Sequence, residues 1–439
     1  MPLEFSFVFP FVQSHFQPRT ALFALAVGIT ALASAPASRG QDNALQLQTA
    51  SDYAVRTRTT RAAAPEATRK PSTVPAAFKA RPGPWGELEY FTVFLEASVS
   101  ALKSMDLQTY ETIWQFVGYT EDQVAALFSS IKLPAELQAD LLDRKKWRRE
   151  DKDVIVLPTE SVLLGLSPEA RAAIYEVLGR WEENTFQHEP HLVSGQNVRE
   201  WLARAKLPEE IVATIEKGAY LRNQNLVFAD TPLVLRMVKS DEERLKIRKA
   251  LSRTPTLIVK LKVQADSDIP KIAEYWGGFT RSKDVQPFLE SVSEIPGTNV
   301  IDIIHLLPTG VRRLLYTFPS ASHGRTGYYP DCHWSSLNFG NFDPLERLGD
   351  PALATAYTLE NYSRIPSGQS YKFGDVLFFM DGSTGNAIHS CVYLADEIVY
   401  TKNGRSPTQP WVLMKLDDVV SFYGMYYKPQ LACYRRKAE

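Results

Sequence analysis

The sequence predicts an α+β fold in which a mainly helical region precedes a domain that packs a helix on a small antiparallel sheet. Helix-start signals are frequent in the first part of the chain. Thr120-Glu-Asp-Gln123 is a capping box, and Ser167-Pro168 places a proline at the first helical position. Apolar runs of strand length follow in the second part, at residues 373–379, 388–394 and 398–404.

Length and composition restrict the class of protein. A chain of 439 residues is long enough for two or three domains, and 44% hydrophobic with 23% charged residues is an ordinary globular balance. The formal net charge of −1 gives no support for nucleic acid as a partner. Three cysteines are too few for a disulfide scaffold, and their odd number leaves at least one thiol free or paired between molecules.

Residues 1–37 have the pattern of a signal peptide. The apolar run Ala21–Ala33 follows Arg19, and Ala33-Ser34-Ala35 is a small-residue cleavage pattern. A run of about 13 residues is too short to span a bilayer. We therefore expect an exported protein, periplasmic or secreted, without an integral membrane segment after cleavage. An uncleaved anchor and an unstructured apolar N-terminus are the alternatives.

Three further segments follow the expected signal peptide. Residues 38–84 are rich in Ala, Thr, Pro and Arg, and we expect a disordered linker. Residues 85–252 are expected to form a mainly helical domain of unknown role, which begins with a helix from Leu88 to about Met105. Residues 253–439 are expected to form the domain that carries the chemistry.

Neither a metal nor an organic cofactor is expected. His188 and His191 are three residues apart, but no third ligand stands nearby, and Pro190 between them favours a loop over a helix that presents ligands.

Cys332 is the candidate nucleophile. It follows Asp331, a residue type that caps helices, and an apolar helical pattern comes after it. A thiol in the first turn of a helix lies near backbone N–H groups and the positive end of the helix dipole, which stabilise a thiolate. We therefore expect an activated cysteine at this position.

His389 is the candidate base. His333 is adjacent to the cysteine in sequence, but neighbouring side chains on a helix point about 100° apart. His389 begins a predicted strand in which His389, Cys391 and Tyr393 share one face. A third polar residue should orient the imidazole, and Asn403 is the first choice because an amide oxygen accepts an N–H well.

Thr401 is the second choice for the orienting residue. Asn403 has a competing explanation, because Asn403-Gly404 is also a strong hairpin-turn dipeptide.

The segment from about 310 to 423 resembles NlpC-type papain-like cysteine peptidases. The resemblance rests on Asp331-Cys332 before a helix, on Gly-Asp-Val-Leu-Phe-Phe ending at Phe379, and on His389 followed by Tyr393-Leu394. Here His333 and Trp334 follow the cysteine, where that family usually has two small residues.

The resemblance implies a papain-like fold and a function. Members of that family commonly cleave cell-wall peptides of bacterial murein or act as amidases. By analogy, Cys332 is the nucleophile, His389 is the base, and Thr401 or Asn403 is the orienting residue. Candidates for contacts with the substrate or its oxyanion are Tyr328, Tyr329, Asp331 and Thr401.

The leading hypothesis is an exported cysteine hydrolase that cleaves an amide in a cell-wall peptide through a thioester. Two alternatives remain open. The papain-like unit can be catalytically degenerate and bind the cell wall or a protein, or an amine can replace water so that the acyl group is transferred. Cys332 and Cys391 can also form a disulfide in an exported protein.

Overall fold

A computed structural model describes residues 77–104, 110–278, 281–297, 299–320 and 329–437. Within these ranges the chain forms α-helices and four β-sheets, and the strands paired in each sheet are antiparallel. Helices combined with separate antiparallel sheets agree with the α+β class. The expected signal peptide and residues 38–76 of the expected linker lie outside the described ranges. No helix in the described ranges is long and apolar enough to span a bilayer.

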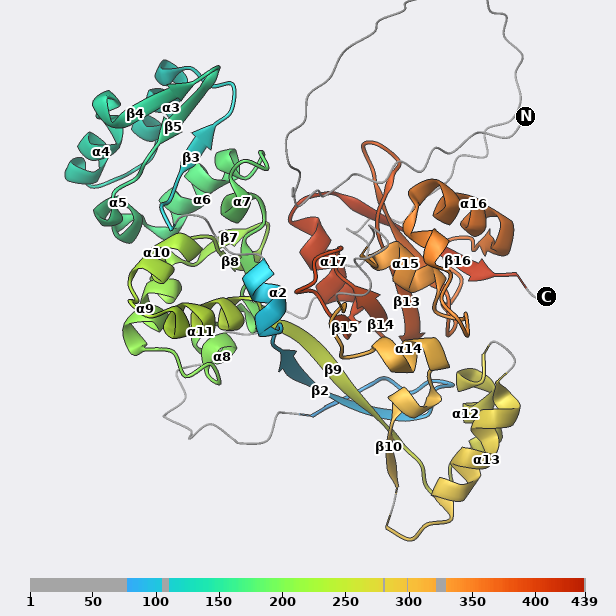
Figure 1. The fold of residues 1–439 in the computed structure, drawn as a ribbon. Helices are drawn as coiled ribbons and strands as arrows, with labels where there is room; N and C mark the ends of the chain where they lie inside the picture. The colour runs from blue at the N-terminus through green and yellow to red at the C-terminus, as the bar shows by residue number, and fades with distance from the viewer. Residues whose placement is uncertain (1–76, 105–109, 279–280, 298, 321–328, 438–439) are drawn as a thin grey trace, which may run out of the picture.

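The largest sheet lies in the C-terminal part of the chain and has the order β11-β16-β12-β13-β14-β15 (Figure 1). Its strands are β11 (Tyr362–Arg364), β12 (Val376–Asp381), β13 (Ala387–Ala395), β14 (Ile398–Lys402), β15 (Trp411–Lys415) and β16 (Pro429–Arg436). The three apolar runs predicted to be strands form β12, β13 and β14. The last strand, β16, inserts between β11 and β12.

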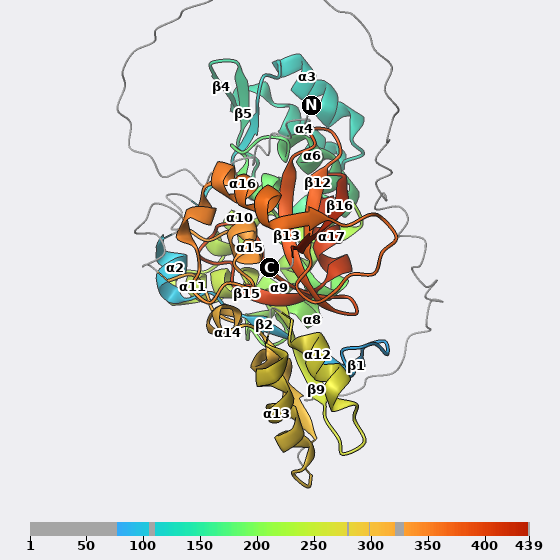
Figure 2. The same ribbon diagram turned by 90° about the vertical axis from the view of Figure 1, so that its right-hand side faces the viewer.

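The two faces of this sheet pack against different helices. Val392 and Leu394 of β13 contact a core that includes Trp334 and Leu337, next to α15 (Cys332–Leu337). Cys391 lies on the opposite face, in a core that includes residues of α17 (Leu416–Gly424). Figure 2 shows β13 between α15 and α17. The short helix η5 (Glu346–Gly349) and α16 (Pro351–Asn361) flank α15.

A second sheet of order β1-β2-β9-β10 contains a long two-stranded ribbon (Figure 1). Its strands are β1 (Phe78–Lys79), β2 (Glu87–Leu95), β9 (Thr254–Lys262) and β10 (Val300–Asp302). β2 pairs with β9 over its full length, from Glu87 opposite Lys262 to Leu95 opposite Thr254. Two helices lie between β9 and β10 in the chain, α12 (Ile269–Trp276) and α13 (Ser282–Ser293). Two more follow β10, η3 (Ile303–Leu306) and α14 (Thr309–Leu314).

The helix expected from Leu88 to Met105 is wrong, because residues 87–95 form β2 and only Val99–Ser104 is helical (α2). Leu88 and Tyr90 are buried while Glu87 and Glu89 are exposed, an alternation with the period of a strand. The ribbon also crosses the expected boundary between residues 252 and 253, and β1 lies inside the expected linker.

The region from 114 to 251 contains two repeats of one arrangement. Each repeat is an edge strand, two helices, a β-hairpin and two more helices, and the strand orders β3-β5-β4 and β6-β8-β7 correspond. Lys132-Leu133-Pro134 precedes α4 in the first repeat and Lys206-Leu207-Pro208 precedes α9 in the second. Both prolines have φ −54° and ψ 141°.

The first repeat consists of β3 (Trp114–Phe116), α3 (Glu121–Ser130), α4 (Ala135–Leu142), η1 (Arg144–Lys146), β4 (Trp147–Glu150), β5 (Asp153–Val156), α5 (Glu160–Gly165) and α6 (Pro168–Leu178), and α7 (Thr185–His188) follows it. The second consists of β6 (His191–Leu192), η2 (Ser194–Gln196), α8 (Val198–Leu202), α9 (Glu209–Gly218), β7 (Tyr220–Arg222), β8 (Asn225–Phe228), α10 (Thr231–Arg236) and α11 (Asp241–Leu251).

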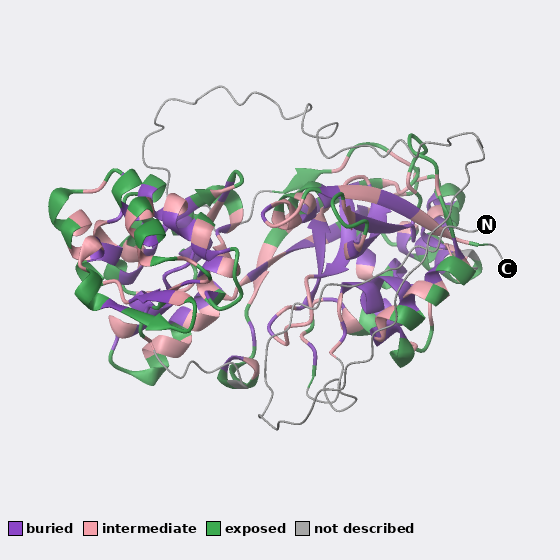
Figure 3. Ribbon diagram, turned by 90° about the horizontal axis from the view of Figure 1, so that it is seen from above, coloured by how far each residue is buried: buried purple, intermediate pink, exposed green. Residues whose placement is uncertain are grey.

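The predicted capping box at Thr120 and the predicted cap at Ser167 are confirmed at α3 and α6. In the view from above, buried residues fill the interior of this region and of the large sheet (Figure 3).

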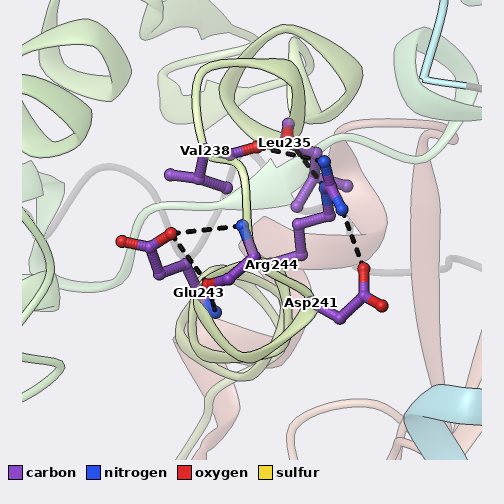
Figure 4. A network of polar contacts seen from close by, with 6 residues as sticks. Leu235, Val238, Asp241, Glu243 and Arg244 are labelled. Atoms are coloured by element: carbon purple, nitrogen blue, oxygen red, sulfur yellow. Dashed lines mark hydrogen bonds and ion pairs between the residues drawn. The ribbon is translucent and has the colours of Figure 1, made fainter.

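Each repeat anchors its last helix with an arginine four residues after the capping serine. In the second repeat Arg244 donates to the carbonyl oxygens of Leu235 at 3.3 Å and Val238 at 3.1 Å (Figure 4). In the first repeat Arg171 donates to the carbonyl oxygen of Leu163 at 2.6 Å. Arg171 also forms a fully buried ion pair with Asp230, which links the two repeats.

We expect Asp230→Ala to lower the free energy of unfolding by about 3–5 kcal/mol, because the Arg171 charge would stay buried without its partner. Urea unfolding followed by tryptophan fluorescence measures the change. Asp241→Ala is the matched control, since it removes the partner of Arg244, a carboxylate whose side chain is 95% exposed. The control should cost less than about 1 kcal/mol. Equal losses in both variants would contradict the importance of the buried pair.

Candidate active site

The thiol of Cys332 lies at the first residue of α15, which packs across β13 and β14. The cap predicted at Asp331 is confirmed: its carboxylate accepts a hydrogen bond from the backbone N–H of Trp334 at 2.8 Å. The same carboxylate accepts from the Arg405 guanidinium at 3.2 Å. Capping at one end and the packing of Trp334 and Leu337 in the core therefore fix the position of the thiol.

His389 is completely buried on β13. Its Nε2 lies 3.0 Å from Thr401 Oγ1 on β14. Its ring meets the edge of Phe379, with centroids 5.1 Å apart, and stacks on Tyr423 with centroids 4.1 Å apart. The other ring nitrogen, Nδ1, has no hydrogen-bond partner among the described residues. When the Thr401 hydroxyl accepts from Nε2–H, Nδ1 is left free to accept a proton.

The structure places Thr401 beside the imidazole, whereas Asn403 lies elsewhere. Asn403 Nδ2 donates to the Met414 sulfur at 3.4 Å, and Asn403 Oδ1 is buried without a partner among the described residues. Gly404 has a φ of +77°, but residues 403–410 connect β14 to β15, so Asn403-Gly404 does not form a two-residue hairpin turn. Tyr329 is partly buried ahead of α15, and Tyr328 lies outside the described residues.

The Cys332 sulfur lies against the strand that carries His389. Backbone N–H groups of Ser390 and His333 donate toward it. Even so, burial, followed by the Asp331 carboxylate, raises the pKa of Cys332 to about 12. Burial also lowers the pKa of His389 well below its ordinary value. Both groups are therefore neutral at physiological pH in this structure.

The expectation of a thiolate stabilised by the helix terminus is thus wrong for this conformation. The helix has only six residues, so few peptide dipoles act on the sulfur. Removal of water disfavours the charged form, and here that cost exceeds the stabilisation from the two backbone donors.

His333 belongs to the core and does not face the thiol as a base. Its Nδ1 lies 3.0 Å from Ser390 Oγ, and its ring stacks on Phe378 with centroids 5.9 Å apart. Burial lowers the pKa of His333 to about 4.

The N-terminal repeats reach the site through α17. Tyr423 of this helix covers one face of His389. The side chains of Asn225 and Ser421 are joined by a hydrogen bond of 2.8 Å, and Asn225 also donates to the Ser421 carbonyl oxygen at 3.1 Å. Asn223 donates to the Met425 carbonyl oxygen at 3.2 Å. The second repeat therefore holds the helix that covers the histidine.

Two residues of the site were missed in the sequence. Tyr423 is remote from β13 in the chain, and no local pattern marks it. Lys402 is completely buried next to Cys332 and Asp331. A lysine at an inward position of a predicted buried strand was the available signal.

The other cysteines and histidines considered in the sequence are not part of this site. Cys332, Cys391 and Cys433 are all buried and free, so the disulfide alternative is not formed here. His188 Nδ1 lies 2.9 Å from the Gly179 carbonyl oxygen and His191 Nε2 lies 3.0 Å from Thr231 Oγ1. In the part of the chain that the structure describes, no group of three His, Cys, Asp or Glu side chains could hold a metal ion.

Comparison with known protein families, with curated proteins and with solved structures finds no match for this chain.

We expect native Cys332 to react with iodoacetamide at pH 8 at least about a hundredfold more slowly than the same residue in concentrated urea. The thiolate is the reactive form, and the pKa raised from 9.0 to about 12 keeps the native thiol protonated. Peptide mass mapping of the alkylated cysteines at timed intervals measures both rates. Equal rates in the native and unfolded protein would contradict a buried, neutral thiol.

Proposed function

We propose that this protein is a cysteine hydrolase that cleaves an amide through a thioester on Cys332. The observation that carries the proposal is His389, whose Nε2 is bonded to Thr401 while its Nδ1 is unpaired, on the strand against which the Cys332 thiol packs. A cysteine at a helix start, a histidine on an antiparallel sheet and a polar residue on the next strand are the residue types that nucleophilic thiol catalysis uses.

The reaction begins from a neutral pair. No hydrogen bond joins His389 Nδ1 to Cys332 Sγ among the described residues, so the two groups have to approach each other when the substrate binds. His389 Nδ1 then takes the proton from Cys332 Sγ as the sulfur attacks the carbonyl carbon of the amide, and the tetrahedral intermediate forms. The amine then leaves with the proton from His389 Nδ1, and a thioester remains on Cys332. Water gives a proton to Nδ1 and attacks the thioester, so the acid departs and the thiol is restored.

Thr401 acts on the histidine alone in this mechanism. In the tautomer that leaves Nδ1 without a hydrogen, the Thr401 hydroxyl accepts from Nε2–H and holds the orientation of the ring. A neutral resting pair suits a buried site, because no charge has to be desolvated before the substrate binds.

The substrate class comes from the resemblance to NlpC-type peptidases. It favours an amide in a murein peptide, a papain-like fold for residues 253–439, and an exported enzyme that works in the periplasm or outside the cell. The helix that begins at Cys332 and the small antiparallel sheet that carries His389 and Thr401 support this proposal.

The burial of the site favours a second candidate function, a catalytically inactive module that binds the cell wall or a protein. Cys332 is only 5% exposed, and Tyr423 covers His389. Bulky His333 and Trp334 follow the cysteine, which agrees with a closed subsite.

Incubation with murein fragments and simple peptides distinguishes the cysteine hydrolase from the inactive binding module. The released amines are analysed. A hydrolase releases new amines with the wild-type protein, and Cys332→Ala and His389→Ala abolish the release. Murein binding without release in wild type and both variants would overturn the hydrolase and leave the binding module.

We expect Thr401→Val to lower kcat/KM about 3- to 10-fold, because one hydrogen bond to the imidazole contributes roughly 0.5–1.5 kcal/mol. Asn403→Ala is the matched control and should change kcat/KM less than about twofold, since Asn403 contacts Met414. Initial rates on the best amide of the panel measure both. A larger loss in Asn403→Ala than in Thr401→Val would show that the amide orients the base.

A further inference from the structure

Lys402 is a buried amine that the mechanism above does not use. It is the last residue of β14 and is completely buried. Its Nζ donates to the carbonyl oxygens of Gly404 at 2.7 Å and Ser406 at 3.3 Å. The ammonium also lies 5.8 Å from the centre of the Trp411 ring, which is its cross-strand partner on β15.

The surroundings of Lys402 connect it to the first turn of α15. Trp411 Nε1 donates to Ser335 Oγ at 2.8 Å. Ser335 stands three residues after Cys332, so the two side chains are neighbours on the surface of the helix. Residues alternate along β14, so Thr401 faces His389 while Lys402 faces α15. Lys402 therefore lies on the face of the sheet that α15 covers, whereas His389 lies on the opposite face.

The two hydrogen bonds of Lys402 use two of the three hydrogen or lone-pair positions on Nζ and leave the third available. An ammonium has three N–H groups, whereas a neutral amine has two N–H groups and a lone pair. The two carbonyl oxygens take two donors in either state. The third position is an N–H when the residue is charged and a proton acceptor when it is neutral.

The other charges around Lys402 are already paired. Asp331 and Cys332 face it from α15, and Arg405 faces it from the loop after β14. Asp331 accepts from Arg405 at 3.2 Å, so these opposite charges offset each other. A thiolate on Cys332 would then have the Lys402 ammonium as its counter-charge.

We propose that Lys402 is a second proton acceptor for the Cys332 thiol. The step rests on the proposed function and deepens it. The Sγ–H bond of Cys332 breaks, an Nζ–H bond forms on Lys402, and a buried thiolate–ammonium pair results. The ammonium gives this proton to the leaving amine as the thioester forms. His389 Nδ1 then takes a proton from the attacking water and returns it to the sulfur when the thiol is regenerated.

The protonation of Lys402 agrees with this role. Burial lowers the pKa of Lys402 to about 7, so the neutral amine is well populated at neutral pH. When the site loses one proton near pH 7, two states with the same number of protons become possible. In one, Cys332 is a thiol and Lys402 a neutral amine; in the other, Cys332 is a thiolate and Lys402 an ammonium. The population of thiolate then rises with pH up to about 7 and levels off above it.

The pH dependence of iodoacetamide alkylation of Cys332 between pH 5.5 and 9 tests the proposal in the full-length protein. The wild type should show a tenfold rise per pH unit that breaks near pH 7. Lys402→Arg keeps the charge and the donors but cannot accept a proton, so its rate should rise without a break. Lys402→Met should also lack the break and react about tenfold more slowly at pH 7.

His389→Ala and Lys415→Met are the controls, and both should keep the break near pH 7. Lys415 is a partly buried lysine on β15 that contacts Phe78 and Tyr90. Circular dichroism shows which variants are folded. If Lys402→Met does not fold, Lys402→Arg still supplies the test.

A break that survives in Lys402→Arg, or one that is lost only in His389→Ala, would overturn the role of Lys402 and leave the cysteine hydrolase standing. A wild-type profile with no break would also overturn it. Absence of alkylation in all folded variants up to pH 9 would count against both the lysine and the hydrolase.

Discussion

The register of β13 against β12 and β14 determines where each chemical group of the site lies. Because side chains alternate across a strand, a shift by one residue would move His389 to the α15 face and Ser390 to the α17 face. In the observed register Phe379 stands opposite His389 and Val392 stands opposite Tyr400. This register brings Thr401 to the imidazole and directs Lys402 toward the helix that carries Cys332.

Removal of water is the second constraint on the chemistry. Cys332, His389 and Lys402 are all buried, and burial is the largest cause of the pKa shift of each. The same cause raises the pKa of an acid and lowers that of a base, so all three groups favour their neutral forms. The cover over His389 includes Tyr423, whose helix is held by Asn223 and Asn225. Changes in the N-terminal repeats can therefore reach the histidine through α17.

Local sequence signals predicted the framework of the site but not its environment. The cap at Asp331 and the strand of His389 depend on neighbouring residues, so both could be recognised directly. The choice between Thr401 and Asn403 depends on where β14 ends, because Thr401 lies inside the strand beside His389 and Asn403 follows the strand and contacts Met414. The sequence of β2 predicts a helix because its apolar spacing fits both structures, and its partner β9 is more than 150 residues away. The raised pKa of Cys332 follows from its burial in the folded chain, which no local pattern reveals.

Intact-protein mass spectrometry after rapid mixing with p-nitrophenyl acetate tests the central role of Cys332 most directly. A catalytic pair of Cys332 and His389 predicts a single added acetyl group, located on Cys332 by peptide mapping, that disappears with time. The adduct should be absent in Cys332→Ala and form at least about a hundredfold more slowly in His389→Ala. Acetylation confined to surface lysines, or an adduct on Cys332 that forms equally fast without His389, would contradict the catalytic pair.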